Sequence, residues 1–134
     1  MPVMLGQNNM SIKPGHIYIS PGDHHMLINS NLTITLDDGP KENFVRPAAD
    51  PMFRSIANTF NERSVAIVLT GLGRDGSNGS QVIKKINGKV IIQDPTTAIA
   101  PSMPRSVLDE GIADVNTTVD QIPRKIAEFI KKLV

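Results

Sequence analysis

The sequence predicts an α/β protein with a mainly parallel, doubly wound sheet, helices on both faces and one antiparallel β-hairpin. One observation is that short β-branched runs such as Val65–Thr70 alternate with segments whose apolar residues recur at helical spacing. A second is that these runs are continuously apolar, which is typical of strands buried on both faces. A third is that two short runs, His25–Ile28 and Leu32–Leu36, flank Asn29–Asn31 and predict the hairpin.

The N-terminal part is predicted to hold short strands, the hairpin and the first helix. His16–Ser20 follows the turn residues Lys13–Gly15 and predicts a strand. The hairpin spans about His25–Leu36, and the Asp37–Pro40 segment ends it. Apolar residues at helical spacing within Ala48–Phe60 then predict a helix.

The C-terminal part alternates between predicted strands and helices. In chain order these are a strand over Val65–Thr70, a helix through Val82–Ile86, a strand over Lys89–Gln93, a helix over about Pro104–Asp109, a strand over Ile112–Val115 and a helix over about Val119–Leu133. Parallel strands joined by helices need right-handed crossovers, which cover the sheet on both faces. Ligands in such sheets bind beyond the carboxyl ends of the strands, where the loops Gly71–Gly79 and Asp94–Met103 lie.

Composition excludes several classes of function. The 134 residues contain no cysteine, which excludes disulfides, thiolate metal sites and cysteine catalysis. Aromatic residues make up 4% and the net charge is +1, so we expect no nucleic-acid partner. No apolar run approaches the roughly 18 residues of a membrane span, so we expect a cytoplasmic protein with no membrane insertion. Nothing in the pattern calls for a metal or a cofactor.

The glycine-rich loop after Val65–Thr70 offers one alternative function. Gly71, Gly73 and Gly76 satisfy G-x-G-x-x-G between a strand and a helix. Asp94 lies near the spacing expected of a ribose-binding acid. These residues together make a dinucleotide-binding module the alternative to be weighed.

Two features of the same loop weaken that alternative. Asp75 would place a negative charge where the backbone must approach a pyrophosphate, and Ser77–Ser80 is polar and predicted to be loop. An Asp-Gly turn, in which the aspartate bonds the backbone, is the commoner meaning of Asp75-Gly76. The position of Asp75 just past a buried strand, among glycines that allow close approach, nevertheless makes it a candidate functional residue.

Segments that follow one another along the chain resemble the CheB family of chemotaxis methylesterases. Leu69–Gly79 is similar to the family's Leu-Thr-Gly-Met-Gly-x-Asp-Gly loop, and Gly15–Met26 to its Gly-x-Ile-Tyr-Ile-Ala-Pro-x-x-x-His-Met segment. Arg46–Phe53 resembles Arg-Pro-Ser-x-Asp-x-Leu-Phe, while Gln93–Ala98 and Ser102–Arg105 resemble Gln-Asp-x-x-x-Ser and Gly-Met-Pro-x-x-Ala. Because these matches keep the family's order over nearly the whole chain, it is identified as the C-terminal part of such a catalytic domain.

The resemblance implies a Ser-His-Asp hydrolase that removes methyl esters from glutamyl side chains of methylated chemoreceptor cytoplasmic domains, and that can deamidate certain receptor glutamines. Asp75 matches the family's triad aspartate, whose carboxylate holds the histidine that activates the serine. Leu72 stands where the family usually has Met, a position whose backbone N–H helps to form the oxyanion hole. Gly71, Gly73 and Gly76 belong to the same oxyanion loop. Met103 is predicted to line the substrate cleft, although a methionine beside proline is equally a packing residue.

The family's serine and histidine are not evident in this sequence. None of the candidate serines lies in the tight glycine-flanked turn that exposes a nucleophile; they are Ser20, Ser55, Ser77, Ser80 and Ser102. His25 matches a family histidine that is not the triad base, and we expect it, His16 and His24 to make surface or structural hydrogen bonds. The chain alone is therefore expected to be inactive.

Residues 1–134 are thus predicted to form a single partial methylesterase domain that lacks its N-terminal segment and any receiver domain. Three explanations are left open: a truncated or proteolysed enzyme, a half that pairs with a complementing chain, and a non-catalytic receptor-binding relative. Strands left without partners would expose apolar surface, which predicts self-association.

Overall fold

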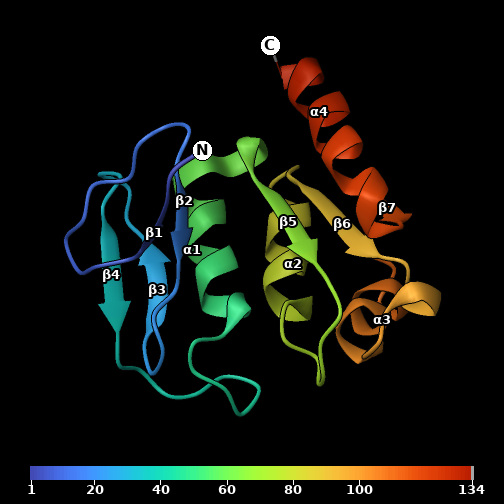
Figure 1. The fold of residues 1–134 in the computed structure, drawn as a ribbon, viewed down its shortest axis with the longest axis horizontal. Coiled ribbons are helices and arrows are strands. Elements are labelled where there is room, and N and C mark those ends of the chain that lie inside the picture. The colour runs from blue at the N-terminus through green and yellow to red at the C-terminus, as the bar shows by residue number, and fades with distance from the viewer. Residues whose placement is uncertain (134) are drawn as a thin grey trace.

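The computed structural model describes residues 1–133 (Figure 1). Its elements, in chain order, are β1 (Val3–Leu5), β2 (Ile17–Ile19), β3 (His25–Ile28), β4 (Ile34–Asp37), α1 (Ala49–Phe60), β5 (Val65–Val68), α2 (Ser77–Lys85), β6 (Lys89–Gln93), α3 (Ser102–Asp109), β7 (Val115–Thr117) and α4 (Ile122–Leu133). Short 3₁₀ turns occupy Asn61–Arg63, Pro95–Thr97 and Val119–Gln121. Among these described helices, none is both long and apolar enough to cross a membrane.

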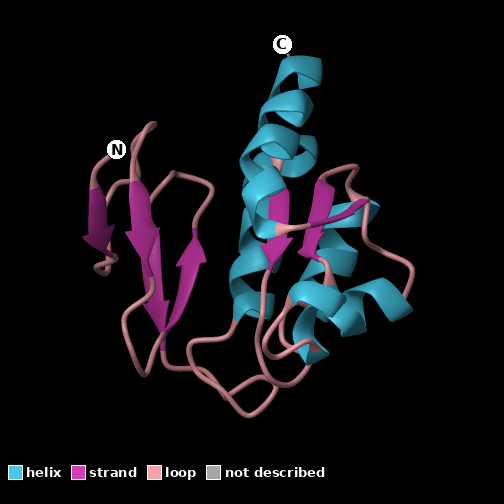
Figure 2. Cartoon of the chain, turned by 45° about the vertical axis from the view of Figure 1, so that its right-hand side comes forward, coloured by secondary structure: helices cyan, strands magenta, loops and turns pink. Residues whose placement is uncertain are grey.

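The strands form one parallel three-stranded sheet and two separate strand pairs. In the sheet, β6 lies between β5 and β7, with Val65 opposite Lys89 and Ile91 opposite Val115. The pair β1–β2 is parallel, and β3–β4 is the antiparallel hairpin. Figure 2 shows both pairs standing apart from the three-stranded sheet, on the other side of α1. The predicted α/β class, the parallel sheet and the hairpin are therefore confirmed.

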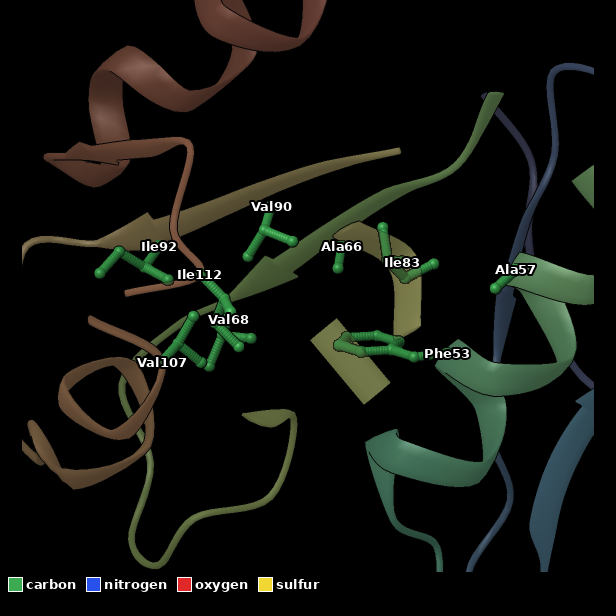
Figure 3. Packing of buried hydrophobic residues seen from close by; sticks show 9 residues of the cluster. All are labelled: Phe53, Ala57, Ala66, Val68, Ile83, Val90, Ile92, Val107 and Ile112. Carbon is green, nitrogen blue, oxygen red and sulfur yellow. The ribbon is translucent and has the colours of Figure 1, made fainter. Parts of the chain in front are cut away.

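The side chains of β6 alternate between the two faces of the sheet, and helices cover both faces. Val90 and Ile92 join a buried cluster with residues of α1, α2 and α3, and Figure 3 shows these side chains meeting between the helices and the sheet. Ile91, which is also fully buried, points to the opposite face because successive strand residues alternate. On that face α4 packs against β6, with Lys89 Nζ 5.8 Å from the centre of the Phe129 ring.

Helix α1 is covered on two sides. On one side it packs against α2, and Phe53 and Ala57 enter the main cluster. On the other side, Met26 and Ile28 of the hairpin form a second cluster that contacts α1. The helix thereby fixes the hairpin to the sheet, and its N-terminus is brought to the loop that follows β5.

Two predicted boundaries are wrong in ways that matter. The predicted loop Ser77–Ser80 is the first turn of α2, with Ser77 and Ser80 fully buried. A Cβ at Gly79 would lie 2.6 Å from Phe53 Cβ, so a polar-looking segment is in fact a close helix-packing surface. The predicted strand Ile112–Val115 is also displaced, because β7 begins at Val115 and Ile112 packs into the core from the preceding loop.

Candidate active site

The loop after β5 and the loop after β6 meet at the carboxyl edge of the sheet, where the fold class predicts a ligand site. Thr70 N–H donates to Gln93 Oε1 at 2.9 Å, which joins the ends of the two strands. Gly73 and Gly76 have φ angles of 89° and 96°, a left-handed backbone that other residues rarely adopt. These turns carry the chain from β5 to Asp75 and then into α2.

The Asp75 carboxylate is held at the N-terminus of α1. Its Oδ2 accepts a hydrogen bond from Ala49 N–H at 2.6 Å, and its Oδ1 accepts one from Asp50 N–H at 3.1 Å. Oδ1 also accepts from Gly76 N–H at 3.0 Å and from Asn43 Nδ2 at 3.1 Å. A negative charge is favourable beside the unpaired amides and positive dipole end of a helix. The carboxylate is therefore fixed at both oxygens by the fold.

A second carboxylate, that of Asp50 in α1, binds the N-terminus of α2. Asp50, which lies in the first turn of α1 and is 2% exposed, accepts from Gly76 N–H at 3.1 Å and from Gly79 N–H at 2.7 Å. Its other oxygen accepts from Asn43 Nδ2 at 2.8 Å. Each of the two helices thus receives at its N-terminus a carboxylate that belongs to the other helix or to the loop leading into it.

The candidate oxyanion loop is tied to the start of α3. Gly71 N–H donates to the Ala100 carbonyl at 2.8 Å, and Met103 N–H donates to the Gly71 carbonyl at 3.1 Å. Ser102 Oγ accepts from Gly73 N–H at 3.0 Å and donates to the Gly71 carbonyl at 3.1 Å. The backbone on both sides of Leu72 is consequently fixed.

Leu72 differs from its neighbours in this loop. Its N–H donates to no acceptor within residues 1–133, whereas the N–H groups of Gly71 and Gly73 are both used. Its side chain is 84% exposed. A free backbone N–H on a rigid, accessible loop is what stabilisation of a developing oxyanion requires.

Comparison with known protein families matches residues 1–126 to the CheB methylesterase family. The chain belongs to this family. A protein-glutamate methylesterase/protein-glutamine glutaminase of Caulobacter vibrioides is 42% identical over 125 residues, which cover 90% of this chain and 36% of that protein. A relative of the same name from Pyrococcus abyssi is 38% identical, with 91% and 34% covered.

A solved structure gives the same result for the fold. The CheB methylesterase catalytic domain of Thermotoga maritima superposes with a TM-score of 0.88 at 36% sequence identity, over 92% of this chain and 67% of that one. The chain spans about a third of the length of the curated relatives named above.

Membership of the CheB methylesterase family leaves the dinucleotide-binding alternative without support. The argument made against that alternative from a loop at Ser77–Ser80 is nevertheless wrong, because these residues are helical.

Asp94, which the dinucleotide-binding alternative would use to bind a ribose, makes local hydrogen bonds with its carboxylate. Its Oδ1 accepts from Thr96 N–H at 2.9 Å and from Thr96 Oγ1 at 2.8 Å. These two hydrogen bonds, with the backbone one contributing most, hold the pKa of the Asp94 carboxyl below its usual value. Asp94 therefore caps the short turn Pro95–Thr97.

Met103 packs against Gly71 and the border of the main core cluster. A Cβ at Gly71 would lie 2.3 Å from Met103 Sδ, and Met103 contacts the main core cluster from its border. The packing interpretation of Met103 is thus confirmed. Its predicted role in a substrate cleft stays a prediction.

The three histidines make the expected structural contacts. His25 is 2% exposed; its Nδ1 accepts from Ala48 N–H at 3.2 Å, so its Nε2 carries the proton donated to the Pro40 carbonyl at 2.8 Å. His24 pairs with Asp38, and His16 Nδ1 lies 2.9 Å from the Pro14 carbonyl. No serine is hydrogen-bonded to a histidine within residues 1–133. The same residues contain no group of three acidic or histidine side chains that could hold a metal ion.

Sequence reasoning missed two residues of the site. Asp50 lies within the Arg46–Phe53 motif but received no role, because its partners Gly76 and Gly79 are more than 20 residues away. Asn43 belongs to no matched motif. The sequence gives one hint of its importance, which is that Asn43 is an asparagine in a turn. Asparagine tolerates the left-handed φ of 54° that Asn43 adopts.

Proposed function

We propose that this chain takes part in the hydrolysis of methyl esters on glutamyl side chains of chemoreceptors, with Asp75 as the triad acid and Leu72 N–H as an oxyanion donor. Its relatives are named protein-glutamate methylesterases and protein-glutamine glutaminases, which supports both ester hydrolysis and glutamine deamidation. The observation that carries the proposal is the Asp75 carboxylate, which the loop after β5 places at the N-terminus of α1 and whose Oδ2 accepts, within the part of the chain that the structure describes, only from Ala49 N–H.

The roles follow from the chemistry of a triad. A serine hydroxyl is too weakly acidic to attack unaided, so a histidine takes its proton as the new bond to the carbonyl carbon forms. Asp75 would accept the other imidazole N–H, hold the ring in the right tautomer and stabilise its positive charge. Leu72 N–H would donate to the oxygen that becomes negative. The histidine then gives this proton to the leaving group as the bond to the carbonyl carbon breaks, which releases methanol from an ester or ammonia from an amide, and water hydrolyses the acyl-serine in the same way.

The serine and the histidine are proposed to come from outside residues 1–134. Ser77 and Ser80 are fully buried in α2, and the Ser102 hydroxyl is used by the backbone of Gly71 and Gly73. His25 is buried with both ring nitrogens in use. We use the term complete enzyme for residues 1–134 together with the segment that supplies the serine and histidine.

The test is methanol release from a methylated chemoreceptor. We expect the complete enzyme to release methanol and residues 1–134 alone to release none, with serine labelling by a fluorophosphonate in the complete enzyme only. Methanol release by residues 1–134 alone would contradict the proposed division of the triad. No release by the complete enzyme would favour the alternative, a non-catalytic receptor-binding half-domain.

Pairing with a second chain is proposed on separate grounds. Strands β1 and β2 expose large apolar side chains, namely Val3, Leu5, Ile17 and Ile19. Exposed apolar residues on a sheet of only these two strands are what supports self-association or a complementing chain. A monomer of residues 1–134 in sedimentation experiments would exclude self-association.

A further inference from the structure

One amide group joins the two carboxylates of the site. Asn43 Nδ2 donates to Asp50 Oδ2 at 2.8 Å and to Asp75 Oδ1 at 3.1 Å. An amide nitrogen has two hydrogens, so each carboxylate receives one of them. With acceptors on both sides, only this orientation of the amide satisfies the contacts. Asn43 and Gly76 N–H are the donors that the two carboxylates share.

The two oxygens of Asp75 are not equivalent. A carboxylate oxygen has two lone pairs. Oδ1 accepts from three donors, Asn43 Nδ2, Asp50 N–H and Gly76 N–H, and is therefore saturated. Among residues 1–133, Oδ2 accepts only from Ala49 N–H, which leaves one lone pair free. One oxygen is thus anchored to the fold, and the other can take a further donor.

The loop that carries Asn43 is itself fixed. The Glu42 carboxylate accepts from Arg54 Nη2 at 2.6 and 2.7 Å, and Arg54 Nη1 donates to Asn78 Oδ1 at 3.0 Å. Glu42, the neighbour of Asn43, is therefore tied to α1 through Arg54, and Arg54 is tied in turn to α2 through Asn78. Such contacts are expected where the protein must fix the orientation of a side chain as well as its position.

We propose that Asn43 and Asp50 are positioning residues for Asp75. They hold Oδ1, and by doing so they direct the free lone pair of Oδ2 to the N–H of the catalytic histidine. Asp50 acts on the geometry by holding Asn43 and the Gly76 and Gly79 amides, and Asn43 acts on it by donating to Oδ1. The inference rests on the proposed function, since it assigns residues that orient the proposed acid.

Three variants of the complete enzyme separate positioning from simple structural support. Asn43→Asp places a carboxylate oxygen against two others, and Asp50→Asn places a second donor against Asn43 Nδ2. The double variant Asn43→Asp with Asp50→Asn restores a donor–acceptor pair between positions 43 and 50 and restores the net charge. In the double variant, however, Asp75 Oδ1 faces an oxygen instead of an N–H.

We expect Asn43→Asp to lower kcat for methanol release about 10- to 100-fold while KM stays within roughly twofold, because a misdirected catalytic group impairs the chemical step. In the double variant we expect the melting temperature to recover the part of its loss that comes from the contact between positions 43 and 50, and kcat to stay low. Recovery of kcat in parallel with the melting temperature would overturn the positioning role.

A milder pair of variants guards against misfolding. Asn43→Gly removes the donor without adding charge, and its φ of 54° suits glycine. Phe44→Gly is the matched control, since Phe44 has a φ of 68° and a side chain that is 96% exposed. We expect the kcat loss in Asn43→Gly and wild-type kcat in Phe44→Gly. Wild-type kcat in Asn43→Gly would overturn the inference.

The Asp75→Asn variant distinguishes this inference from the function on which it rests. If Asp75→Asn keeps wild-type kcat, the proposed acid itself is wrong. If Asp75→Asn loses activity while every Asn43 variant keeps it, the proposed function stands and the positioning role of Asn43 and Asp50 is wrong.

Discussion

Replacing Asp75 with alanine is expected to lower kcat of the complete enzyme about 10⁴-fold, as loss of the acid does in other Ser-His-Asp enzymes. Without the carboxylate, the histidine loses the group that orients its ring and stabilises its charge. The change also removes the acceptor for Ala49 N–H and Asp50 N–H, so we expect a lower melting temperature as well. Steady-state methanol release and thermal unfolding measure the two effects.

Two further variants separate catalysis from helix capping. Asp75→Asn keeps the shape and one acceptor oxygen, but its NH2 group replaces an oxygen that accepts from a backbone N–H, so we expect part of the stability to return and kcat to remain low. Asp94→Asn is the matched control, because Asp94 follows the neighbouring strand and, within residues 1–133, its carboxylate accepts only from Thr96. We expect it to retain kcat within about twofold. An Asp75→Ala enzyme with more than a tenth of wild-type kcat would exclude Asp75 as the triad acid.

Replacing Gly79 with alanine is expected to destabilise the protein, although alanine is the better helix former. A Cβ at this position would lie 2.6 Å from Phe53 Cβ and 3.0 Å from the Asp50 carbonyl oxygen. Overpacking of this kind costs about 1–3 kcal/mol, and the gain in helix propensity offsets about 1 kcal/mol of it. Urea unfolding should show a net loss of up to roughly 2 kcal/mol in the free energy of unfolding.

Gln81→Ala provides the control for Gly79→Ala. Gln81 lies in α2 but is exposed, so the same new residue meets no neighbour and should change stability by less than about 0.5 kcal/mol. Stabilisation by Gly79→Ala would show that α1 and α2 do not pack as closely as described here. The second carboxylate of the site, Asp50, would then lack its contact with Gly79.

The sequence predicts most of the fold because hydrophobic period and turn residues agree along most of the chain. The strand Lys89–Gln93 has the predicted bounds, and Pro123 lies in the first turn of α4, where its missing N–H is tolerated. The prediction fails where tertiary contacts decide. Ser77–Ser80 looks like loop, yet the Asp50 carboxylate accepts from Gly79 N–H and close packing against α1 makes it helix.

The candidate site is predictable only in part for the same reason. Asp75 and the loop around Leu72 stand together in one motif, so the sequence alone is enough to propose them. The contacts of Asn43 with Asp50 and Asp75 join residues from three segments, and no local pattern indicates them. Nor does a local pattern show that the Leu72 N–H is free while those of Gly71 and Gly73 are used.

The most direct test of Asp75 as the triad acid is a crystal structure of the complete enzyme, in which the acceptor of the histidine N–H is seen. We expect that N–H to lie within hydrogen-bond distance, about 2.6–3.2 Å between heavy atoms, of Asp75 Oδ2. Oδ1 should keep its bonds to Asn43, Asp50 and Gly76. A histidine that donates to a different acceptor, with Asp75 bonded only to the helix amides and Asn43, would contradict the proposed role.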